Sequence, residues 1–545
     1  GIANCVVAFK IKTDKDTGAL DGNNAFKARC CYDDSKIRNI AKARERAEMV
    51  AKYHQQIAVK KAERVAEPFS SVVADDILIK ALFAVAATGR TLTKADVKDA
   101  YSKGIRSQPP SYMYMPRLMQ ELADDGEELI FELGSPLWGE QAAGRDWQDT
   151  LHAELIRLGW KACEDVPAMY RYVGKSSECV LITIVDDLLF SESAGYEIAS
   201  ATIAGLRKAF GEVTSEREPT SFAGYKVTRD WETCAITLSM PETIEAMVRE
   251  HYPHFLVSKP AAMLKGKELR DAADSLEMPP AEERARKLDK VQSKTRSVTG
   301  SLKYQERKVK PILSLAVHRL SCVTACPPLA AARVAEAVAW QAWETRFDGI
   351  TFGGEPSADL TNVQGAITTS AFSMDDGAPE WLHTSADAAW RGQPTPPADV
   401  LGIVVTLNRA AIYHSVKKVS LILNSSHEIE SIGSGKGAEV NTIAREIMRA
   451  HGVPMTRPTE ILCDNQAHVS LANKKAWPSA SRTFLRRYHA LLERIEAGEA
   501  TVIKVSDAEN PADFLTKWVS AAKLRRSVDY ATNAKRACAA SRAPR

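Results

Sequence analysis

The stretch ITIVDDLLF at residues 182–190 sets two adjacent carboxylates, Asp186 and Asp187, in an otherwise apolar or β-favouring run. The run is short enough to be a buried strand or hairpin. Burying an isolated carboxylate is very costly, so such a pair is expected to lose its charge, to pair with a cation or to bind a metal. A divalent metal ion suits two acids that cannot point far apart, and we predict one here.

A further acid, Asp96, lies upstream in the strand-like segment ADVKDAY at residues 95–101. One carboxylate on one strand and two on another can hold paired metal ions against the attacking and leaving oxygens of phosphoryl transfer. Polymerases are among the enzymes built in this way. Asp-Asp pairs are also common on solvated loops, but the apolar flanks and the Asp96 segment favour a metal site.

Other segments extend the pattern along the chain. They are KAR at 27–29, EPFSSVV at 67–73, DVKDAYSKG at 96–104, LWGEQAAGRDW at 137–147, VDDLL at 185–189 and RSVTGSLKY at 296–304. In this order they resemble KAR, ETFSPVV, DVKTAFLNG, LYGLKQAPRAW, YVDDLL and YRSLVGSLMY of the reverse transcriptases of copia-type long-terminal-repeat retrotransposons. The resemblance runs from about Phe9 to about Val519, and it implies an α+β right-hand polymerase with fingers, palm and thumb.

The resemblance also implies roles for the acids. Asp96 and Asp186 would bind both Mg²⁺ ions, with Mn²⁺ as an alternative, and Asp187 would help to shape the site. Tyr101 stands at the family's aromatic position beneath the sugar, where a ring would clash with a ribose 2′-hydroxyl. The other reading of Tyr101 is a half-buried strand aromatic that only packs.

Three more positions are assigned to substrate by the resemblance. Lys27 and Arg29 would meet the triphosphate of the incoming nucleotide, and Arg offers the better planar fork for phosphate. Gln141 would be the glutamine near the incoming base, although the segment Glu140–Gly144 is a poor copy of the family's LKQAP. Ile184 likewise replaces the tyrosine that the family has before Val-Asp-Asp.

A second set of spaced acids follows a polar linker at 360–379: Asp387, Glu428, Asp464 and Asp513. They fall in a strand, helix, strand, helix order, with the long helix predicted over 429–450. The neighbouring segments SVKK at 415–418, DNQ at 464–466, RYH at 487–489 and ADFLTK at 512–517 resemble SSKKQ, CDNQ, RYH and ADIFTK of the copia-type ribonuclease H. The resemblance implies that all four acids hold two metal ions that activate water against an RNA phosphodiester.

Pattern and length divide the 545 residues into several domains. We predict reverse transcriptase fingers and palm over 1–240 and a thumb or connection over 241–375. An α/β ribonuclease H-like domain is predicted over 380–520, and a basic tail over 521–545. Within the first part, helices are predicted over 77–87, 144–159 and 197–210, around the strand or hairpin over 179–190.

Charge distribution points to nucleic acid more than net charge does, since the formal net charge is only +3. Basic stretches occur at 36–64, 284–310 and 517–545, and such stretches suit sequence-independent contacts with phosphate. We expect an RNA template, a DNA primer, RNA–DNA hybrid and dNTPs as partners. The same stretches are also typical of ordinary solvated helix faces.

Cysteine usage predicts an intracellular protein, and the resemblance implies a cytoplasmic particle, the nucleus or both. The ten cysteines suggest no disulfide scaffold, so they are interpreted as reduced thiols. The sequence contains no run of eighteen apolar residues, so no membrane span is predicted, and no secretory leader is visible at Gly1. The missing initiator methionine suits a piece of a larger polyprotein.

The sequence leaves three functions open. The favoured one is an RNA-directed DNA polymerase with an attached ribonuclease H, encoded by a transposable element. The second is a catalytically decayed remnant that still folds and binds nucleic acid, because positions around the acids have drifted; Ile429 and Ser431, for example, break the family's TEAEY around Glu428. The third is a structural subunit whose acids only carry surface charge.

Overall fold

The computed structural model describes residues 2–11, 26–33, 75–107, 111–114, 130–140, 142–164, 166, 168–174, 179–260, 263–354, 382–389, 399–419, 426–474 and 482–533. Several predicted features lie outside these ranges: the basic stretch at 36–64, Gln141, the linker at 360–379 and the end of the basic tail, 534–545. Lys27 and Arg29 lie in a described strand, but their side chains are not among those described.

The stretch that carries Asp186 and Asp187 forms a β-hairpin at the centre of a six-stranded sheet of order β10-β3-β9-β8-β7-β6. The strands are β3 (Thr91–Val97), β6 (Trp160–Ala162), β7 (Met169–Tyr172), β8 (Cys179–Ile184), β9 (Asp187–Glu192) and β10 (Val213–Arg217). Nearly every residue of β8 and β9 is buried, because both faces of the sheet are covered. Of the two forms predicted for 179–190, a strand or a hairpin, the structure shows a hairpin.

Three helices cover the six-stranded sheet. Helices α4 (Ala143–Arg157) and α5 (Ile198–Phe210) pack on one face, where Trp147, Leu155 and Leu206 join a common core. Helix α2 (Asp75–Ala86) packs on the other face through an apolar cluster that includes Leu189. The helices predicted over 77–87, 144–159 and 197–210 are therefore confirmed to within a few residues.

Two smaller sheets flank this unit. A four-stranded sheet, β2-β1-β4-β5, begins with the antiparallel hairpin of β1 (Ile2–Ile11) and β2 (Phe26–Asp33). It is completed by β4 (Ser111–Tyr114) and β5 (Ile130–Leu133). The second sheet consists of β11 (Ser221–Phe222), β12 (Tyr225–Arg229), β13 (Ile236–Ser239) and β14 (Ile350–Phe352).

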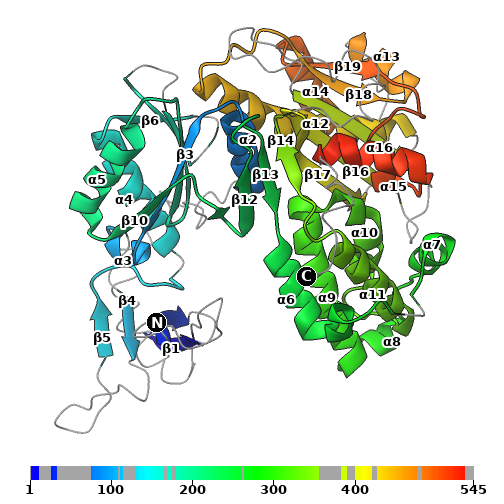
Figure 1. Ribbon diagram of the computed structural model, residues 1–545, viewed down its shortest axis with the longest axis horizontal. Coiled ribbons are helices and arrows are strands. Elements are labelled where there is room, and N and C mark those ends of the chain that lie inside the picture. Colours follow the sequence, from blue (N-terminus) through cyan, green and yellow to red (C-terminus); the bar gives the residue numbers. More distant parts are fainter. Residues whose placement is uncertain are drawn as a thin grey trace.

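A helical bundle follows and occupies the lower right of Figure 1. Its helices are α6 (Pro241–His251), η3 (Pro253–Leu256), α7 (Gly266–Asp274), α8 (Ala281–Arg284), α9 (Lys290–Val309), η4 (Pro311–Leu313), α10 (Ser314–Cys322) and α11 (Leu329–Glu344). Most of these helices share one apolar core, to which α9 contributes Val298 and Leu302. The exposed side of α9 carries much of the basic stretch at 284–310.

The C-terminal part contains a five-stranded sheet of order β17-β16-β15-β18-β19. Strands β15 (Leu382–Ala389), β16 (Val400–Leu407) and β17 (Ala410–Lys418) are antiparallel, and β18 (Thr459–Cys463) and β19 (Ala500–Lys504) run parallel to β15. The helices around it are α12 (Ser426–Ala450), α13 (Gln466–Asn473), α14 (Arg482–Glu496), α15 (Asp513–Thr516) and α16 (Ala521–Thr532).

Helix α12, predicted over 429–450, lies close against the five-stranded sheet. A Cβ atom at Gly433 would approach Leu401 Cδ1 to 2.7 Å, and one at Gly437 would approach Thr384 Cγ2 to 2.4 Å. Because such contacts require something to shift, glycine at these positions lets the helix backbone pack directly on the strands. Gly433 and Gly437 therefore mark the face of α12 that meets the sheet.

Helix α2 lies between the two large sheets and joins them (Figure 1). The side-chain amide of Asn408, at the turn between β16 and β17, donates a hydrogen bond to the carbonyl of Ala84 at 2.7 Å. His414 Nε2 on β17 lies 2.7 Å from the carbonyl oxygen of Glu306 on α9. The six-stranded sheet, the helical bundle and the five-stranded sheet are thus packed against one another.

The start of the predicted basic tail is a packed helix. Residues 521–532 form α16, whose Tyr530 and Ala531 are buried against β16 and β17. The prediction of a tail depended on the basic residues. The apolar spacing of Leu524, Val528 and Ala531 gives this helix a side that faces the core. Within the described part of the chain, every helix is too short or too polar to cross a bilayer.

Candidate active sites

The hairpin β8–β9 positions the first acid pair by its tight turn. Ile184 pairs with Asp187 across the hairpin, so only Val185 and Asp186 form the turn. Val185 adopts a positive φ of 58°, which is unfavourable for a β-branched residue. The indole N–H of Trp147 donates to the carbonyl of Val185 at 2.5 Å and holds the turn in this conformation.

Asp96 meets the hairpin from the neighbouring strand. It lies directly opposite Asp187 in the antiparallel ladder of β3 and β9, and Val97 N–H donates to the carbonyl of Asp186 at 3.2 Å. Asp96 and Asp186 are exposed, whereas Asp187 is half-buried. Burial, followed by the charges of Asp186 and Asp96, raises the pKa of Asp187 to about 6 against the opposing effect of Lys94.

A cavity of about 620 Å³ opens beside Asp96 and Asp187. Its opposite wall is formed by residues 220–226, around the turn between β11 and β12, and by Glu242 and Thr243 at the start of α6. Asp96, Asp186 and Asp187 do not form one of the tight three-ligand groups found among the described residues. The structure therefore brings these acids together at the ends of neighbouring central strands, in an open arrangement that leaves room for a substrate.

Tyr101 lies just beyond the end of β3, on the short helix α3 (Ala100–Lys103). Its ring is half-buried and makes an edge-on contact with Trp138, with ring centroids 6.2 Å apart. Burial raises the pKa of Tyr101, and the charge of Asp186 adds to the effect. Tyr101 therefore lies near Asp186, and its ring is also held by packing against Trp138.

The second set of acids forms a compact cluster. Carboxylate oxygens of Asp387, Asp464 and Asp513 all lie within 4.8 Å of one another. Asp387 lies on β15, Asp464 directly follows the adjacent parallel strand β18, and Asp513 is the first residue of α15. Residues from three separate segments therefore meet at one end of the five-stranded sheet.

Burial dominates the electrostatics of this acid cluster, which we define as Asp387, Asp464 and Asp513. Burial, followed by the charge of Asp513, raises the pKa of Asp387 to about 7. Burial also raises the pKa of Asp464. The Thr516 hydroxyl donates a hydrogen bond to Asp387 Oδ2. Burial therefore disfavours the charged forms of Asp387 and Asp464.

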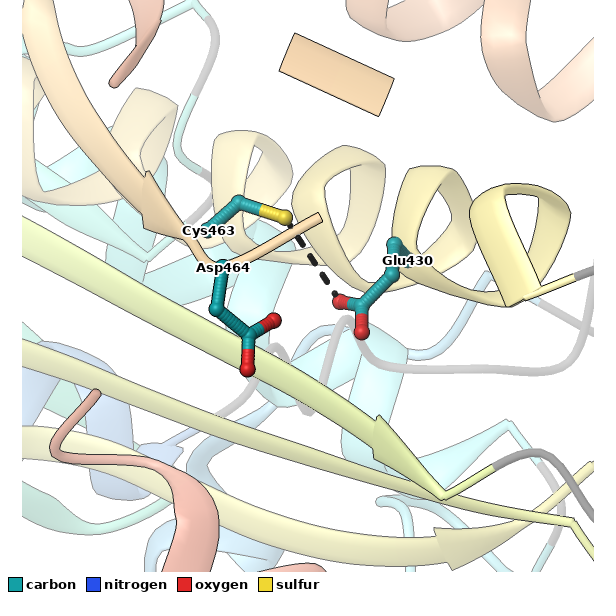
Figure 2. Close-up of side chains that lie close together, drawn as sticks. All are labelled: Glu430, Cys463 and Asp464. Carbon is teal, nitrogen blue, oxygen red and sulfur yellow. Dashed lines mark hydrogen bonds between the residues drawn. The ribbon is translucent and has the colours of Figure 1, made fainter. Parts of the chain in front are cut away.

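Glu430, which the sequence analysis did not select, lies next to the acid cluster, whereas Glu428 is not part of the three-ligand groups. An oxygen of Glu430, the sulfur of Cys463 and an oxygen of Asp464 lie within 4.8 Å of one another. Figure 2 shows these three side chains. Glu430 Oε1 accepts a hydrogen bond from Ala388 N–H at 3.1 Å, and Cys463 Sγ lies 3.8 Å from Oε2. Burial raises the pKa of Glu430 well above its usual range, and Asp387 and Asp464 add to this.

The helical period explains the choice between the two glutamates. Each helical residue turns by about 100°, so positions 428 and 430 point in directions about 200° apart. Glu430 lies three residues before Gly433 and seven residues before Gly437, so it is on the face of α12 that meets the sheet. The glycine spacing was the signal in the sequence that could have identified Glu430.

The donor set of the acid cluster suits a hard divalent cation. Its ligands are all carboxylate oxygens, which Mg²⁺ and Mn²⁺ prefer. Asp513 Oδ1 is buried and accepts no hydrogen bond within the described residues, and the ammonium nitrogen of Lys517 lies 3.4 Å away. A buried charged oxygen without a hydrogen-bond donor needs a cation beside it, and the Lys517 ammonium supplies that charge where a divalent ion would also do so. These residues therefore fit the metal ions that the resemblance implies.

Comparisons with known proteins agree with the motifs. Residues 21–250 match the family model described as reverse transcriptase (RNA-dependent DNA polymerase). Over 495 residues the chain is 23% identical to the retrovirus-related Pol polyprotein from transposon RE1 of Arabidopsis thaliana, a match that covers 88% of the chain and 30% of the relative. Over 488 residues it is 24% identical to the corresponding polyprotein from transposon RE2 of the same plant, with the same coverage.

A third relative is the retrovirus-related Pol polyprotein from transposon TNT 1-94 of Nicotiana tabacum. It is 22% identical over 499 residues, covering 91% of the chain and 35% of the relative. The chain thus spans about a third of the length of these relatives. The predicted resemblance to the Pol polyprotein of copia-type retrotransposons is confirmed.

Proposed function

We propose that this copia-like retrotransposon Pol segment is an RNA-directed DNA polymerase whose polymerising site contains Asp96, Asp186 and Asp187. One observation carries the proposal: within the region that matches the reverse transcriptase family, these three acids meet at the ends of central strands, beside a cavity of about 620 Å³. The six-stranded sheet would be the palm, the sheet that contains β1 and β2 the fingers, and the helical bundle the thumb and connection.

The chain's residues would act mainly by positioning and electrostatics. In the reaction, the 3′-oxygen of a primer attacks the α-phosphate of a dNTP and pyrophosphate leaves. Divalent ions such as Mg²⁺ would neutralise charge on the phosphates. Asp96 and Asp186 would hold the ions, Asp187 would support them, and the Tyr101 ring would lie under the sugar. Lys27 and Arg29 would contact the triphosphate, and Gln141 the incoming base.

We further propose that the C-terminal unit is a ribonuclease H that degrades RNA in RNA–DNA hybrids. Three antiparallel strands followed by two strands parallel to the first, with acids from three segments at one sheet end, support this. Asp387, Asp464 and Asp513 would hold divalent ions. Glu430, rather than Glu428, would be the fourth acid, because it is the glutamate that lies beside Asp464.

The partners would be an RNA template, a DNA primer, their hybrid and dNTPs. Basic residues on the exposed side of α9, between 290 and 307, offer a surface for phosphate. The cavity beside Asp96 and Asp187 lies between the six-stranded sheet and the turn of β11 and β12, where a primer end could approach the acids.

A catalytically decayed, nucleic-acid-binding remnant is the second candidate. It is favoured by one observation: the ammonium groups of Lys517 and Lys523 contact Asp513 in the acid cluster, where the active enzyme would need a metal. The two functions differ in chemistry but share hybrid binding, so binding alone does not separate them.

The discriminating experiment is primer extension on poly(rA)/oligo(dT) with Mg²⁺, run beside cleavage of a labelled RNA in a hybrid. Metal-dependent extension supports the polymerase. Hybrid binding that weakens with salt, without extension or cleavage, supports the remnant. Absence of both binding and extension from a folded chain overturns both candidates.

A further inference from the structure

Lys523 places a cation directly on the acid cluster. Its ammonium group forms an ion pair with Asp513 Oδ2 and donates to the carbonyl of Asp507. The Lys523 side chain is 14% exposed and that of Asp513 is 2% exposed, so the ion pair is largely shielded from water. An ion pair in such surroundings is screened far less than one at the surface.

A second ammonium group stands beside the first. Lys517 Nζ lies 3.5 Å from Asp387 Oδ1, 3.4 Å from Asp513 Oδ1 and 3.0 Å from Asp507 Oδ1. Burial lowers the pKa of Lys517, but the charges of Asp387 and Asp513 outweigh burial and raise it. Two lysines therefore supply positive charge where divalent ions would bind.

The fold holds Lys523 in this place. Lys523 is the third residue of α16, and its backbone N–H donates to the hydroxyl of the capping residue Ser520 at 3.3 Å. The far end of the helix is fixed by the side-chain amide of Asn533, which donates to the carbonyls of Thr351 and Gly353. Tyr530 is buried between these two ends.

The position of Lys523 is unusual for a lysine. The first turn of a helix carries partial positive charge, which disfavours a cation there and favours an anion. The carboxylate of Asp513 offsets this cost. An ammonium group that stays in the first turn of α16 because of Asp513 would lose its counter-ion whenever that carboxylate binds another cation.

We propose that Lys523 is an internal cation that competes with divalent metal for Asp513 and so sets the metal affinity of the acid cluster. The proposal rests on the proposed metal-binding role of Asp387, Asp464 and Asp513. Metal entry requires that the Lys523 ammonium leave Asp513 Oδ2, and α16 determines how readily it does so. Lys523 is thus a positioning residue that acts through Asp513.

The test is Mn²⁺ binding to the full chain, measured by the loss of the free Mn²⁺ signal in electron paramagnetic resonance. All variants carry Asp96→Asn and Asp186→Asn, so that the polymerising site does not contribute. Lys523→Met removes the competing charge, and Lys523→Arg keeps it. Lys504→Met is the matched control, because Lys504 lies beside the cluster but donates to the backbone carbonyls of Asp464 and Val505.

We expect Lys523→Met to tighten Mn²⁺ binding at least about tenfold, equivalent to about 1.4 kcal/mol, while Lys523→Arg and Lys504→Met stay near the parent. Unchanged or weaker binding in folded Lys523→Met overturns the proposal, since Lys523 would then only support Asp513 structurally. Equal tightening in Lys504→Met also overturns it, because general charge would then suffice. If none of the variants binds Mn²⁺ and Asp387→Asn is no different, the proposed metal site itself fails, an outcome distinct from a failure of Lys523 alone.

Discussion

Asp96 and Asp187 lie directly opposite one another in the antiparallel ladder of β3 and β9, so their side chains emerge on the same face of the sheet. Burial raises the pKa of Asp187, and repulsion by the neighbouring carboxylates of Asp186 and Asp96 raises it as well. A site with this repulsion is prepared to bind cations. The strained turn at Val185 places the third acid, Asp186, beside the pair.

We predict that Asp186→Asn abolishes primer extension and leaves the fold and hybrid binding intact. Asp186 is exposed, so its charge is not needed for packing, and the isosteric amide removes a proposed metal ligand. The expected loss is a thousandfold or more, about 4 kcal/mol of transition-state stabilisation. Extension rates, circular dichroism and hybrid affinity are measured together.

Asp149→Asn is the control for Asp186→Asn, because Asp149 is an exposed acid on α4 in an ion pair with Arg145. It should extend primers at the parent rate. If purified Asp186→Asn extends primers as well as Asp149→Asn does, the assignment of the polymerising site is wrong.

We predict that Tyr101→Val raises the incorporation of ribonucleotides relative to deoxyribonucleotides. The Tyr101 ring lies near Asp186, and a smaller side chain would open space for a 2′-hydroxyl. The ratio of kcat/KM for rNTP and dNTP should rise at least about tenfold, or about 1.4 kcal/mol. Tyr101→Phe keeps the ring and should leave the ratio unchanged. An unaltered ratio in Tyr101→Val would mean that the ring only packs against Trp138.

The two glutamates of α12 give a matched pair of variants. We predict that Glu430→Gln reduces cleavage of hybrid RNA at least about a hundredfold, about 2.7 kcal/mol, whereas Glu428→Gln changes it little. The reason is that Glu430 lies beside Asp464 and Glu428 does not join that group. Cleavage of labelled RNA is measured with Mg²⁺ in excess. The reverse pattern would restore Glu428 as the fourth acid.

The sequence was sufficient for features with a strong local signal. The apolar run around Asp186 predicted a buried strand or hairpin, because it is short and rich in β-favouring residues, and the structure shows a hairpin. The long period-3.6 pattern predicted α12, but it did not predict the orientation of the helix about its axis. Choosing Glu430 over Glu428 required the close contacts of Gly433 and Gly437 with the sheet.

Long-range relationships could not be read from the sequence. Helix α16 was hidden because its basic residues suggested a tail, and its apolar side is recognisable only once β16 and β17 are seen to cover it. The contact of Lys523 with Asp513 depends on how α16 is anchored at Asn533, far from either residue along the helix. Local propensity carries no information about such contacts.

A pH-dependent effect on stability is predicted for Lys80, which is fully buried on α2 and donates to the carbonyl of Arg307 at 3.2 Å. Burial lowers the pKa of Lys80 from 10.5 to about 8, although Asp76 opposes the shift. Between these values the unfolded chain binds more protons than the folded one, so this group makes the protein more stable as pH rises. The whole change amounts to about 3 kcal/mol at most.

Lys80→Met lacks this effect. The free energy of unfolding of the parent, relative to Lys80→Met, should therefore increase between pH 7 and pH 10. Thermal or urea unfolding of both proteins at each pH measures the difference. Lys226→Met, which removes a half-exposed lysine near Glu242, should show no such trend. A difference between parent and Lys80→Met that stays constant with pH would show that Lys80 keeps an ordinary pKa.

The last prediction concerns the independence of the two sites. Asp464 directly follows β18 of the five-stranded sheet, whereas Asp96 lies on β3 of the six-stranded sheet, and α2 packs between them. If the acid cluster is a metal site of its own, Asp464→Asn should stop cleavage of RNA in a hybrid while primer extension continues near the parent rate. Loss of one metal ligand should slow cleavage by roughly a thousandfold, about 4 kcal/mol.

Both activities are measured on one preparation of Asp464→Asn, with the hybrid labelled on its RNA strand and the extension primer on its DNA strand. Glu439→Gln is the control, because Glu439 is an exposed acid on α12 in an ion pair with Lys436, and it should retain both activities. Continued cutting by Asp464→Asn would remove Asp464 from the site. A parallel loss of extension and cleavage in a folded protein would mean that one site serves both reactions, because two separate metal sites on two sheets cannot be silenced together by a single isosteric change.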